Sequence, residues 1–222
     1  MRSNVKSTLK ELNLEGELPV TSNEYQYSDN ADFYCYPNTS ILVNQFDIRD
    51  SGKLHETEKE LTAINTQEAL EFQIKGNFDL NHLKAIHKFI FGDIYEWAGK
   101  IRGGDFLSKG DSIFCRAMFI ESMANEIHQK LQAEKYLANL EKAKFISRLA
   151  FYMGEINALH PFREGNGRTQ RVYFGYLCQN AGYGIEFSKV DKDVLLQADI
   201  GAFNRNYDLL VEILNSIVAE QR

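Results

Sequence analysis

Apolar residues recur every three or four positions along most of the chain, which is the spacing of one face of an α-helix. This pattern predicts a series of helices from residue 51 to the end of the chain. The first predicted helix begins at Ser51 and carries Leu54, Leu61, Ile64 and Leu70, and the second follows a turn at 77–79 and carries Leu83, Ile86, Phe89 and Ile90. Two more are predicted over 122–136 and 142–159. Of the last two, one is capped by Ser188 or Asp191 and carries Val194, Leu195 and Leu196, and the other carries Leu209, Leu210, Ile213, Leu214 and Ile217. We interpret the last apolar stripe as core rather than as a partner surface.

A polar run that reads HPFREGNGRTQR, residues 160–171, separates two of the apolar patterns. Pro161 disfavours a helical conformation of the residue before it, so His160 is expected at the end of the preceding helix. Val172 and the apolar residues after it start a second helix, which Gly182 is expected to end. The Gly-Asn-Gly segment at 165–167 is therefore predicted to lie at a helix N-terminus.

This run combines residue types that bind phosphate. The unpaired N–H groups and the positive end of a helix N-terminus favour an anion, and Gly165 and Gly167 would let it approach the backbone closely. Arg168 and Arg171 are three positions apart, so they share a helix face from which guanidinium groups could bind a polyphosphate. Glu164 beside such a site is a candidate ligand for a divalent cation, and magnesium is the one that carboxylate and phosphate oxygens usually share.

His160 is the candidate general base. Its unperturbed pKa near neutrality would allow it to take a proton from a hydroxyl that attacks phosphorus.

Each of these residues also has an ordinary structural interpretation. A lone His at a helix C-terminus usually caps the helix, and the arginines could form a solvated basic face. A dinucleotide-binding fingerprint is excluded, because Gln170 stands where the third glycine would be and a helix rather than a strand precedes the segment.

The run resembles the signature of Fic domains, written His-Pro-Phe-x-(Asp or Glu)-Gly-Asn-Gly-Arg-x-x-Arg, and every fixed position is filled. The segments at 94–102 and 34–37 also resemble this family, and the likeness extends from about Tyr34 to about Gly184. The resemblance implies an all-α fold, the Fic fold, which is a helical bundle with a small β-hairpin flap over the active site. We expect a polar N-terminal arm at 1–33 and a single Fic domain at 34–222.

The same resemblance implies an activity and its residues. Fic enzymes transfer AMP from ATP to a Ser, Thr or Tyr hydroxyl of a target protein and release diphosphate. By this resemblance to Fic enzymes, His160 would be the base and Glu164 would hold Mg²⁺. Gly165, Asn166 and Gly167 would form the anion hole, and Arg168 and Arg171 would bind the β and γ phosphates.

A hairpin is predicted around a turn-like sequence at 109–111. Gly103 and Gly104 are expected to break the helix that contains Trp97, and segments 105–108 and 112–115 would form the two arms. In Fic proteins this flap binds the target by adding it as an extra strand. The flap, about 103–116, would use Phe106, Leu107, Lys109, Gly110 and Phe114. Taken alone, the segment is more typical of an ordinary surface hairpin, and only the neighbouring signature favours a flap.

Length and composition limit the remaining classes. The chain has 222 residues, of which 44% are hydrophobic, and this is enough for one sizeable core. A net charge of −6 argues against direct nucleic-acid binding. Three scattered cysteines and the lack of a signal peptide or membrane span predict a cytoplasmic protein, with delivery into another cell left open.

Many Fic enzymes are restrained by a helix that carries Ser or Thr, three residues, Glu, and then Gly or Asn. The glutamate of that helix pairs with the second motif arginine, here Arg171. Three partial matches occur, none followed by Gly or Asn: Ser7 with Glu11, Ser122 with Glu126, and Ser216 with Glu220. We therefore favour restraint by a separate small antitoxin protein, with Ser216 and Glu220 as the intramolecular alternative.

Three rival functions remain. A Fic-fold kinase is disfavoured because its motif carries Lys at the position of Gly167. A phosphocholine transferase and a non-catalytic nucleotide-binding module are the others. The intact His160, Glu164 and arginines count against a module without turnover.

Overall fold

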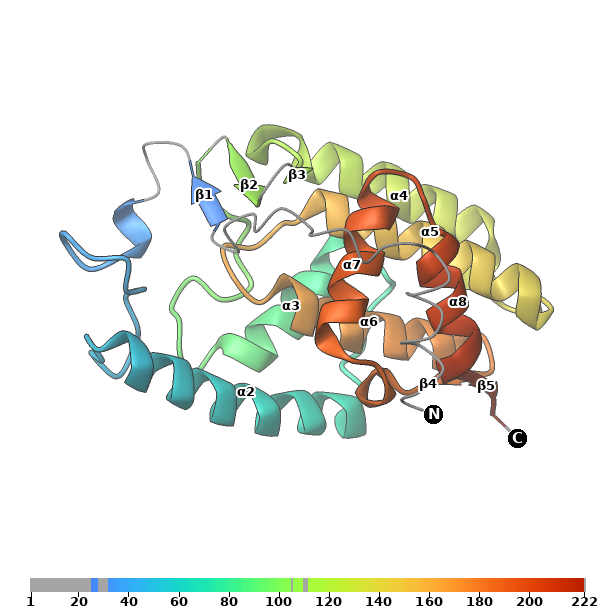
Figure 1. Ribbon diagram of the computed structural model, residues 1–222, viewed down its shortest axis with the longest axis horizontal. Helices are drawn as coiled ribbons and strands as arrows, with labels where there is room; N and C mark the ends of the chain where they lie inside the picture. The colour runs from blue at the N-terminus through green and yellow to red at the C-terminus, as the bar shows by residue number, and fades with distance from the viewer. Residues whose placement is uncertain (1–24, 28–31, 105, 110–111, 222) are drawn as a thin grey trace, which may run out of the picture.

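A computed structural model describes residues 25–27, 32–104, 106–109 and 112–221 of the chain. Most of them lie in helices that pack around one core (Figure 1). The α-helices are α2 (Ser51–Phe72), α3 (Leu80–Phe91), α4 (Ile120–Ala133), α5 (Lys142–Leu159), α6 (Asn166–Asn180), α7 (Lys192–Phe203) and α8 (Asp208–Ile217). Short 3₁₀ turns lie at Asp32–Tyr34, Ala117–Phe119, Lys135–Leu137 and Phe187–Lys189.

The helix starts follow the capping residues in the sequence. Asp50, Asp79 and Asp191 precede α2, α3 and α7, and each carboxylate accepts a backbone N–H of the first turn, at 2.8, 2.8 and 2.9 Å respectively. Asp191 rather than Ser188 is therefore the cap of α7. The predicted bounds of α5 and the predicted N-terminal position of residues 165–167 in α6 are confirmed.

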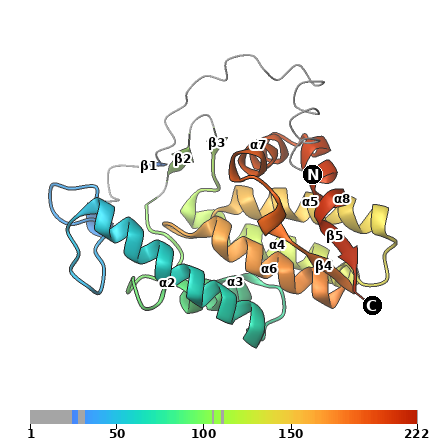
Figure 2. The same ribbon diagram turned by 60° about the horizontal axis from the view of Figure 1, so that its bottom comes forward.

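The core lies where α5 and α6 meet the other helices. In Figure 2, α5 and α6 run through the middle of the molecule, with α2 on one side and α7 and α8 on another. Contacts join α5 to α7 and α8, and α6 to α2 and α3. Phe145, Tyr152 and Phe174 are fully buried there. The stripe on α8 also contributes to the core, as predicted, through Leu210 and Leu214.

Two small antiparallel sheets complete the fold. One has the strand order β1 (Tyr25–Tyr27), β2 (Leu107–Lys109), β3 (Ser112–Ile113), and the other pairs β4 (Tyr183–Ile185) with β5 (Val218–Glu220). The hairpin of β2 and β3 agrees with the predicted flap, although its paired part is shorter. Strand β1 was not predicted, and it comes from the segment interpreted as a polar arm.

The predicted end of the helix that contains Trp97 was wrong. Helix α3 ends at Phe91, so Gly103 and Gly104 do not break a helix that contains Trp97. Turn hydrogen bonds follow instead, such as Ala98 N–H to Tyr95 O at 3.1 Å, and Gly99 adopts a φ of +78° that a continuing helix would not allow.

The structure also contradicts the intramolecular alternative for restraint, in which Ser216 and Glu220 share one inhibitory helix. Helix α8 ends at Ile217, and Glu220 lies on β5 opposite Tyr183. Ser216 and Glu220 therefore do not share a helix face. The Ser7 and Glu11 match lies outside the described residues. In the described part of the chain, no helix has both the length and the apolar character that a membrane span requires.

Candidate active site

The signature residues 160–171 form the connection between α5 and α6 and the first turns of α6. His160 is the C-terminal cap of α5, with a left-handed backbone (φ 44°, ψ 61°) that turns the chain away from the helix axis. Gly165 is the N-terminal cap of α6, with φ 79°. The predicted base, His160, and the predicted anion-binding segment at 165–167, called the anion seat below, therefore lie on the same short connection, as the sequence indicates.

A hydrogen bond and an aromatic contact help to orient the ring of His160. Its Nδ1 lies 3.2 Å from the carbonyl oxygen of Asn157, and its ring stacks on Phe114 with 3.9 Å between the centroids. A carbonyl oxygen can only accept, so in the neutral ring Nδ1 carries the hydrogen. Nε2 then holds the lone pair, which is the tautomer that a general base needs.

The turn before α6 is held by Asn166 and Thr169. Asn166 is buried, and its amide bonds both backbone groups of Phe162, with Oδ1 to N at 3.0 Å and Nδ2 to O at 2.8 Å. The Thr169 hydroxyl donates to Gly165 O at 3.0 Å. Because the Asn166 side chain is occupied in this way, its backbone N–H is the group that it can offer to an anion.

The two glycines of the seat meet different surroundings. A Cβ at Gly165 would lie 2.2 Å from the Phe91 ring, and the positive φ would be strained for any other residue. At Gly167 the nearest atom to an added Cβ is Arg171 Nη1, at 3.4 Å. Gly165 is thus required by packing and backbone conformation, whereas Gly167 leaves open space beside an arginine.

Glu164 provides a partly exposed carboxylate at this turn. Its Oε1 accepts the Gly165 N–H at 2.9 Å and lies 3.7 Å from Arg168 Nη2. Its Oε2 makes no hydrogen bond within the described residues. These residues contain no cluster of three or more His, Cys, Asp or Glu that could hold a metal ion by themselves. One carboxylate fits Mg²⁺, which usually takes one or two carboxylates and completes its shell with phosphate oxygens and water.

His87 on α3 supports the same turn, and the sequence interpretation missed it. Its Nδ1 accepts the Gly99 N–H at 2.8 Å, so its Nε2 donates to the Glu164 carbonyl at 2.9 Å. The ring is fully buried between Phe91 and Phe162, and burial lowers the pKa of His87 to about 4. A signal was available: His87 follows Leu83 by four positions, on the apolar face of a predicted helix.

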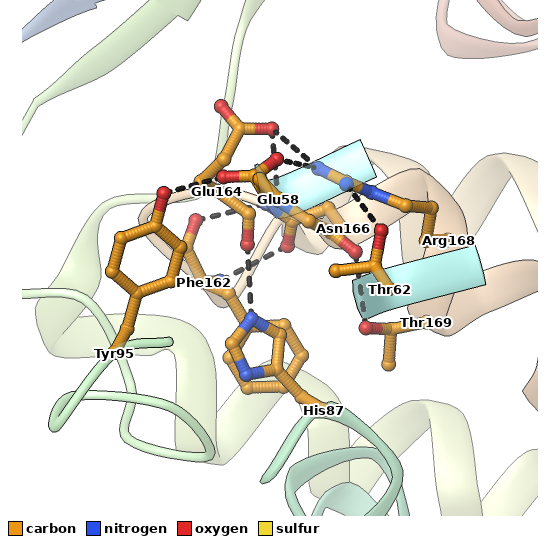
Figure 3. Close-up of polar contacts among 10 residues, drawn as sticks. Glu58, Thr62, His87, Tyr95, Phe162, Glu164, Asn166, Arg168 and Thr169 are labelled. Carbon is orange, nitrogen blue, oxygen red and sulfur yellow. Dashed lines mark hydrogen bonds and ion pairs between the residues drawn. The ribbon is translucent and has the colours of Figure 1, made fainter. Parts of the chain in front are cut away.

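The two motif arginines are held differently. Arg168 donates to Glu58 at 2.6 Å and to Thr62 at 3.0 Å, both on α2 (Figure 3). Arg171 makes no hydrogen bond or ion pair within the described residues, and its pKa is lowered, mainly by burial. Asp199 on α7 is the acid whose charge acts on Arg171, and burial raises the pKa of Asp199 to about 7.

The flap lies against this site. Leu107 and Phe114 are buried, and Phe106 is partly exposed. Phe114 N–H donates to Leu107 O at 3.0 Å, and Cys115 N–H donates to Ala158 O at 2.9 Å, which ties the hairpin to the end of α5. The backbone of Lys109 pairs within the sheet, and Gly110 lies outside the described residues.

Known proteins of one family are similar to this chain. A family model described as the Fic/DOC family matches residues 77–178. A protein of Escherichia coli strain K12 named "Probable protein adenylyltransferase Fic" is 37% identical over 196 residues, which is 88% of this chain and 96% of that protein. The chain belongs to the Fic/DOC family. The resemblance expected from the signature and the mostly helical fold are confirmed.

Two further relatives of this Fic/DOC protein come from Bartonella. "Protein adenylyltransferase VbhT" of B. schoenbuchensis is 40% identical over 195 residues, which is 88% of this chain, and the matched part is 41% of VbhT. The crystal structure of the BepC protein of B. tribocorum with bound AMPPNP has a TM-score of 0.79 and 26% identity. The matched part is 86% of this chain and 98% of the BepC chain.

Proposed function

We propose that this Fic/DOC protein is a protein adenylyltransferase, which transfers AMP from ATP to a Ser, Thr or Tyr hydroxyl of another protein. The observation that carries the proposal is the short connection between α5 and α6, which places an oriented imidazole next to a glycine-bounded helix N-terminus. The names of the relatives support it, and so does the ATP analogue AMPPNP in the BepC structure.

The residues that would bind the phosphates directly divide into two groups, and Glu164 would hold the cation. The backbone of Gly165, Asn166 and Gly167 would receive phosphate oxygens, while Arg168 and Arg171 would bind the β and γ phosphates. Mg²⁺ held by Glu164 and the phosphates would neutralise charge on the triphosphate.

The transfer is a displacement at the α-phosphorus. His160 Nε2 takes the proton of the target hydroxyl, whose oxygen forms a bond to the α-phosphorus. The bond between that phosphorus and the oxygen that bridges to the β phosphate breaks, and diphosphate leaves with the electron pair. The imidazolium is stabilised by the Asn157 carbonyl at Nδ1.

The flap would hold the target. A target segment that adds as a strand would bind by backbone hydrogen bonds, with Phe106, Leu107, Lys109, Gly110 and Phe114 around it. In this chain one edge of β2 is already paired with β1, so a target that uses this edge must displace β1.

Restraint by a separate antitoxin and a cytoplasmic location belong to the same proposal. Within the described residues no glutamate pairs with Arg171, which leaves room for one supplied by another chain. The acidic net charge supports a protein target rather than nucleic acid.

The test is incubation with Mg²⁺, cell lysate and ATP labelled at either the α or the γ phosphate. We expect label on protein only from the α position. Label from the γ position would identify a kinase, and label from neither would leave a phosphocholine transferase or a nucleotide-binding module, so either result rejects adenylylation.

A further inference from the structure

A second acid, Glu58 of α2, lies in the phosphate site beside Glu164. The Glu58 side chain is only 13% exposed, and its Oε1 accepts from Arg168 Nη2 at 2.6 Å. Thr62, one helical turn further along α2, accepts from Arg168 Nη1 at 3.0 Å. Figure 3 shows both α2 side chains meeting the Arg168 guanidinium. Both terminal nitrogens of the fork are therefore fixed by one helix.

Glu58 is itself held in place. The hydroxyl of Tyr95 donates to its other oxygen, Oε2. Tyr95 is fully buried, and its pKa is raised by burial first and by Glu58 second, so it remains the neutral donor of this bond. A carboxylate bound on both oxygens, with Thr62 one turn away, forms a rigid holder for the arginine.

The holder leaves the guanidinium able to bind a ligand. A guanidinium has five N–H donors, and the bonds to Glu58 and Thr62 use one on each terminal nitrogen. Three donors remain for phosphate oxygens. The Arg168 guanidinium also lies over the Phe91 ring, 4.7 Å from its centroid, which limits its tilt.

Arg168 pairs more closely with Glu58 than with Glu164. Arg168 Nη2 is 2.6 Å from Glu58 but 3.7 Å from Glu164, which is four residues earlier in the chain. Without the charge of Glu58, the arginine would be free to pair fully with Glu164. That pairing would occupy the carboxylate that the proposed reaction needs for a cation.

We infer that Glu58 is a positioning residue, which holds Arg168 in the orientation that a nucleotide phosphate needs and keeps this arginine from pairing more closely with Glu164. This inference rests on the proposed function, because the phosphate ligand belongs to it. Net charge alone predicts the opposite effect, since removal of an acid should by itself strengthen the binding of ATP. The loss of arginine orientation therefore predicts weaker ATP binding after substitution of Glu58, whereas the loss of negative charge predicts tighter ATP binding.

The experiment compares Glu58→Gln with wild type and with Glu60→Gln, an exposed position on the same helix. The first readout is the Kd of ATP in EDTA by calorimetry, which needs neither metal nor turnover. We expect Glu58→Gln to raise this Kd about tenfold and Glu60→Gln to leave it unchanged. Equal or tighter ATP binding by Glu58→Gln would mean that Glu58 competes with phosphate, and this would overturn the inference.

A second readout tests whether Glu58 keeps Arg168 from pairing more closely with Glu164. We expect Glu58→Gln to need several-fold more Mg²⁺ for half-maximal transfer, and an unchanged Mg²⁺ requirement would reject this part. If Glu58→Gln does not fold, Tyr95→Phe and Thr62→Val remove single hydroxyl groups of the holder and should raise the ATP Kd in the same direction. A wild-type protein that binds ATP but transfers no AMP would reject the proposed function, while the Kd comparison would still decide the role of Glu58.

Discussion

At His160, Nδ1 contacts the Asn157 carbonyl and the ring stacks on Phe114, so Nε2 is the nitrogen that we propose as the base. We expect His160→Ala to lower transfer from α-labelled ATP by at least about 10²-fold, because the hydroxyl loses its proton acceptor. The ATP Kd should change little, since phosphate binding depends on the helix N-terminus and the arginines. His55→Ala, at an exposed position of α2, is the matched control. Transfer by His160→Ala at the wild-type rate would reject His160 as the base.

The two glycines of the anion seat should respond differently to the same added methyl group. Gly165→Ala would force a Cβ to 2.2 Å from Phe91 at a φ of +79°, so we expect a loss of about 2 kcal/mol or more in the free energy of unfolding. Gly167→Ala meets only Arg171 Nη1 at 3.4 Å and should keep its stability. The Gly167→Ala methyl group should instead weaken ATP binding. Urea unfolding and calorimetry separate the two effects, and equal unfolding free energies for both variants would contradict this assignment.

At the scale of the elements, strand β1 covers an edge of the flap. Gln26 is the central residue of β1 and pairs with Ser108 of β2. We expect Gln26→Pro to weaken this pairing, because proline lacks the backbone N–H and disturbs strand geometry. If a target docks on the same edge, its labelling should increase. Gln26→Ala keeps the N–H and is the control.

The measurement for this prediction is the initial rate of labelling of lysate proteins, with the ATP Kd as a check that the nucleotide site is intact. A Gln26→Pro protein with wild-type ATP binding and no rise in labelling would show that β1 does not compete with the target.

Local patterns predicted the elements well, because helices depend on nearby residues. The bounds of α5 and the cap of α7 follow from spacing and from Asp191, and the signature run correctly predicted that His160 ends one helix and that residues 165–167 begin the next. Contacts between distant segments could not be predicted this way. Arg168 and Glu58 are 110 residues apart in sequence, and β1 is a strand of only three residues that pairs with a segment about 80 residues away.

At the scale of the whole molecule, His87 links stability to pH. Its ring is fully buried, and its pKa in the folded protein is about 4 against an ordinary value of 6.5. Burial is the main cause, and the charges of Arg168 and Lys88 act in the same direction, while the bond to the Glu164 carbonyl opposes them. Between pH 6.5 and 4 the unfolded chain binds more protons at this residue than the folded protein does. The contribution of neutral His87 to the free energy of unfolding is therefore fully present above pH 6.5 and is lost as the pH falls.

We expect acidification from pH 7 to pH 5 to remove roughly 2 kcal/mol of the free energy of unfolding through His87. Other groups also titrate: the pKa of His82 is lowered by burial and acts in the same direction, whereas the raised pKa of Asp199 acts in the opposite one. The test is therefore the difference between wild type and His87→Gln in urea unfolding at each pH. Glutamine can still donate to Glu164 O but does not titrate, so the advantage of the wild type should shrink between pH 6.5 and 5. Parallel curves would mean that His87 is not the neutral buried group that holds the signature turn against α3.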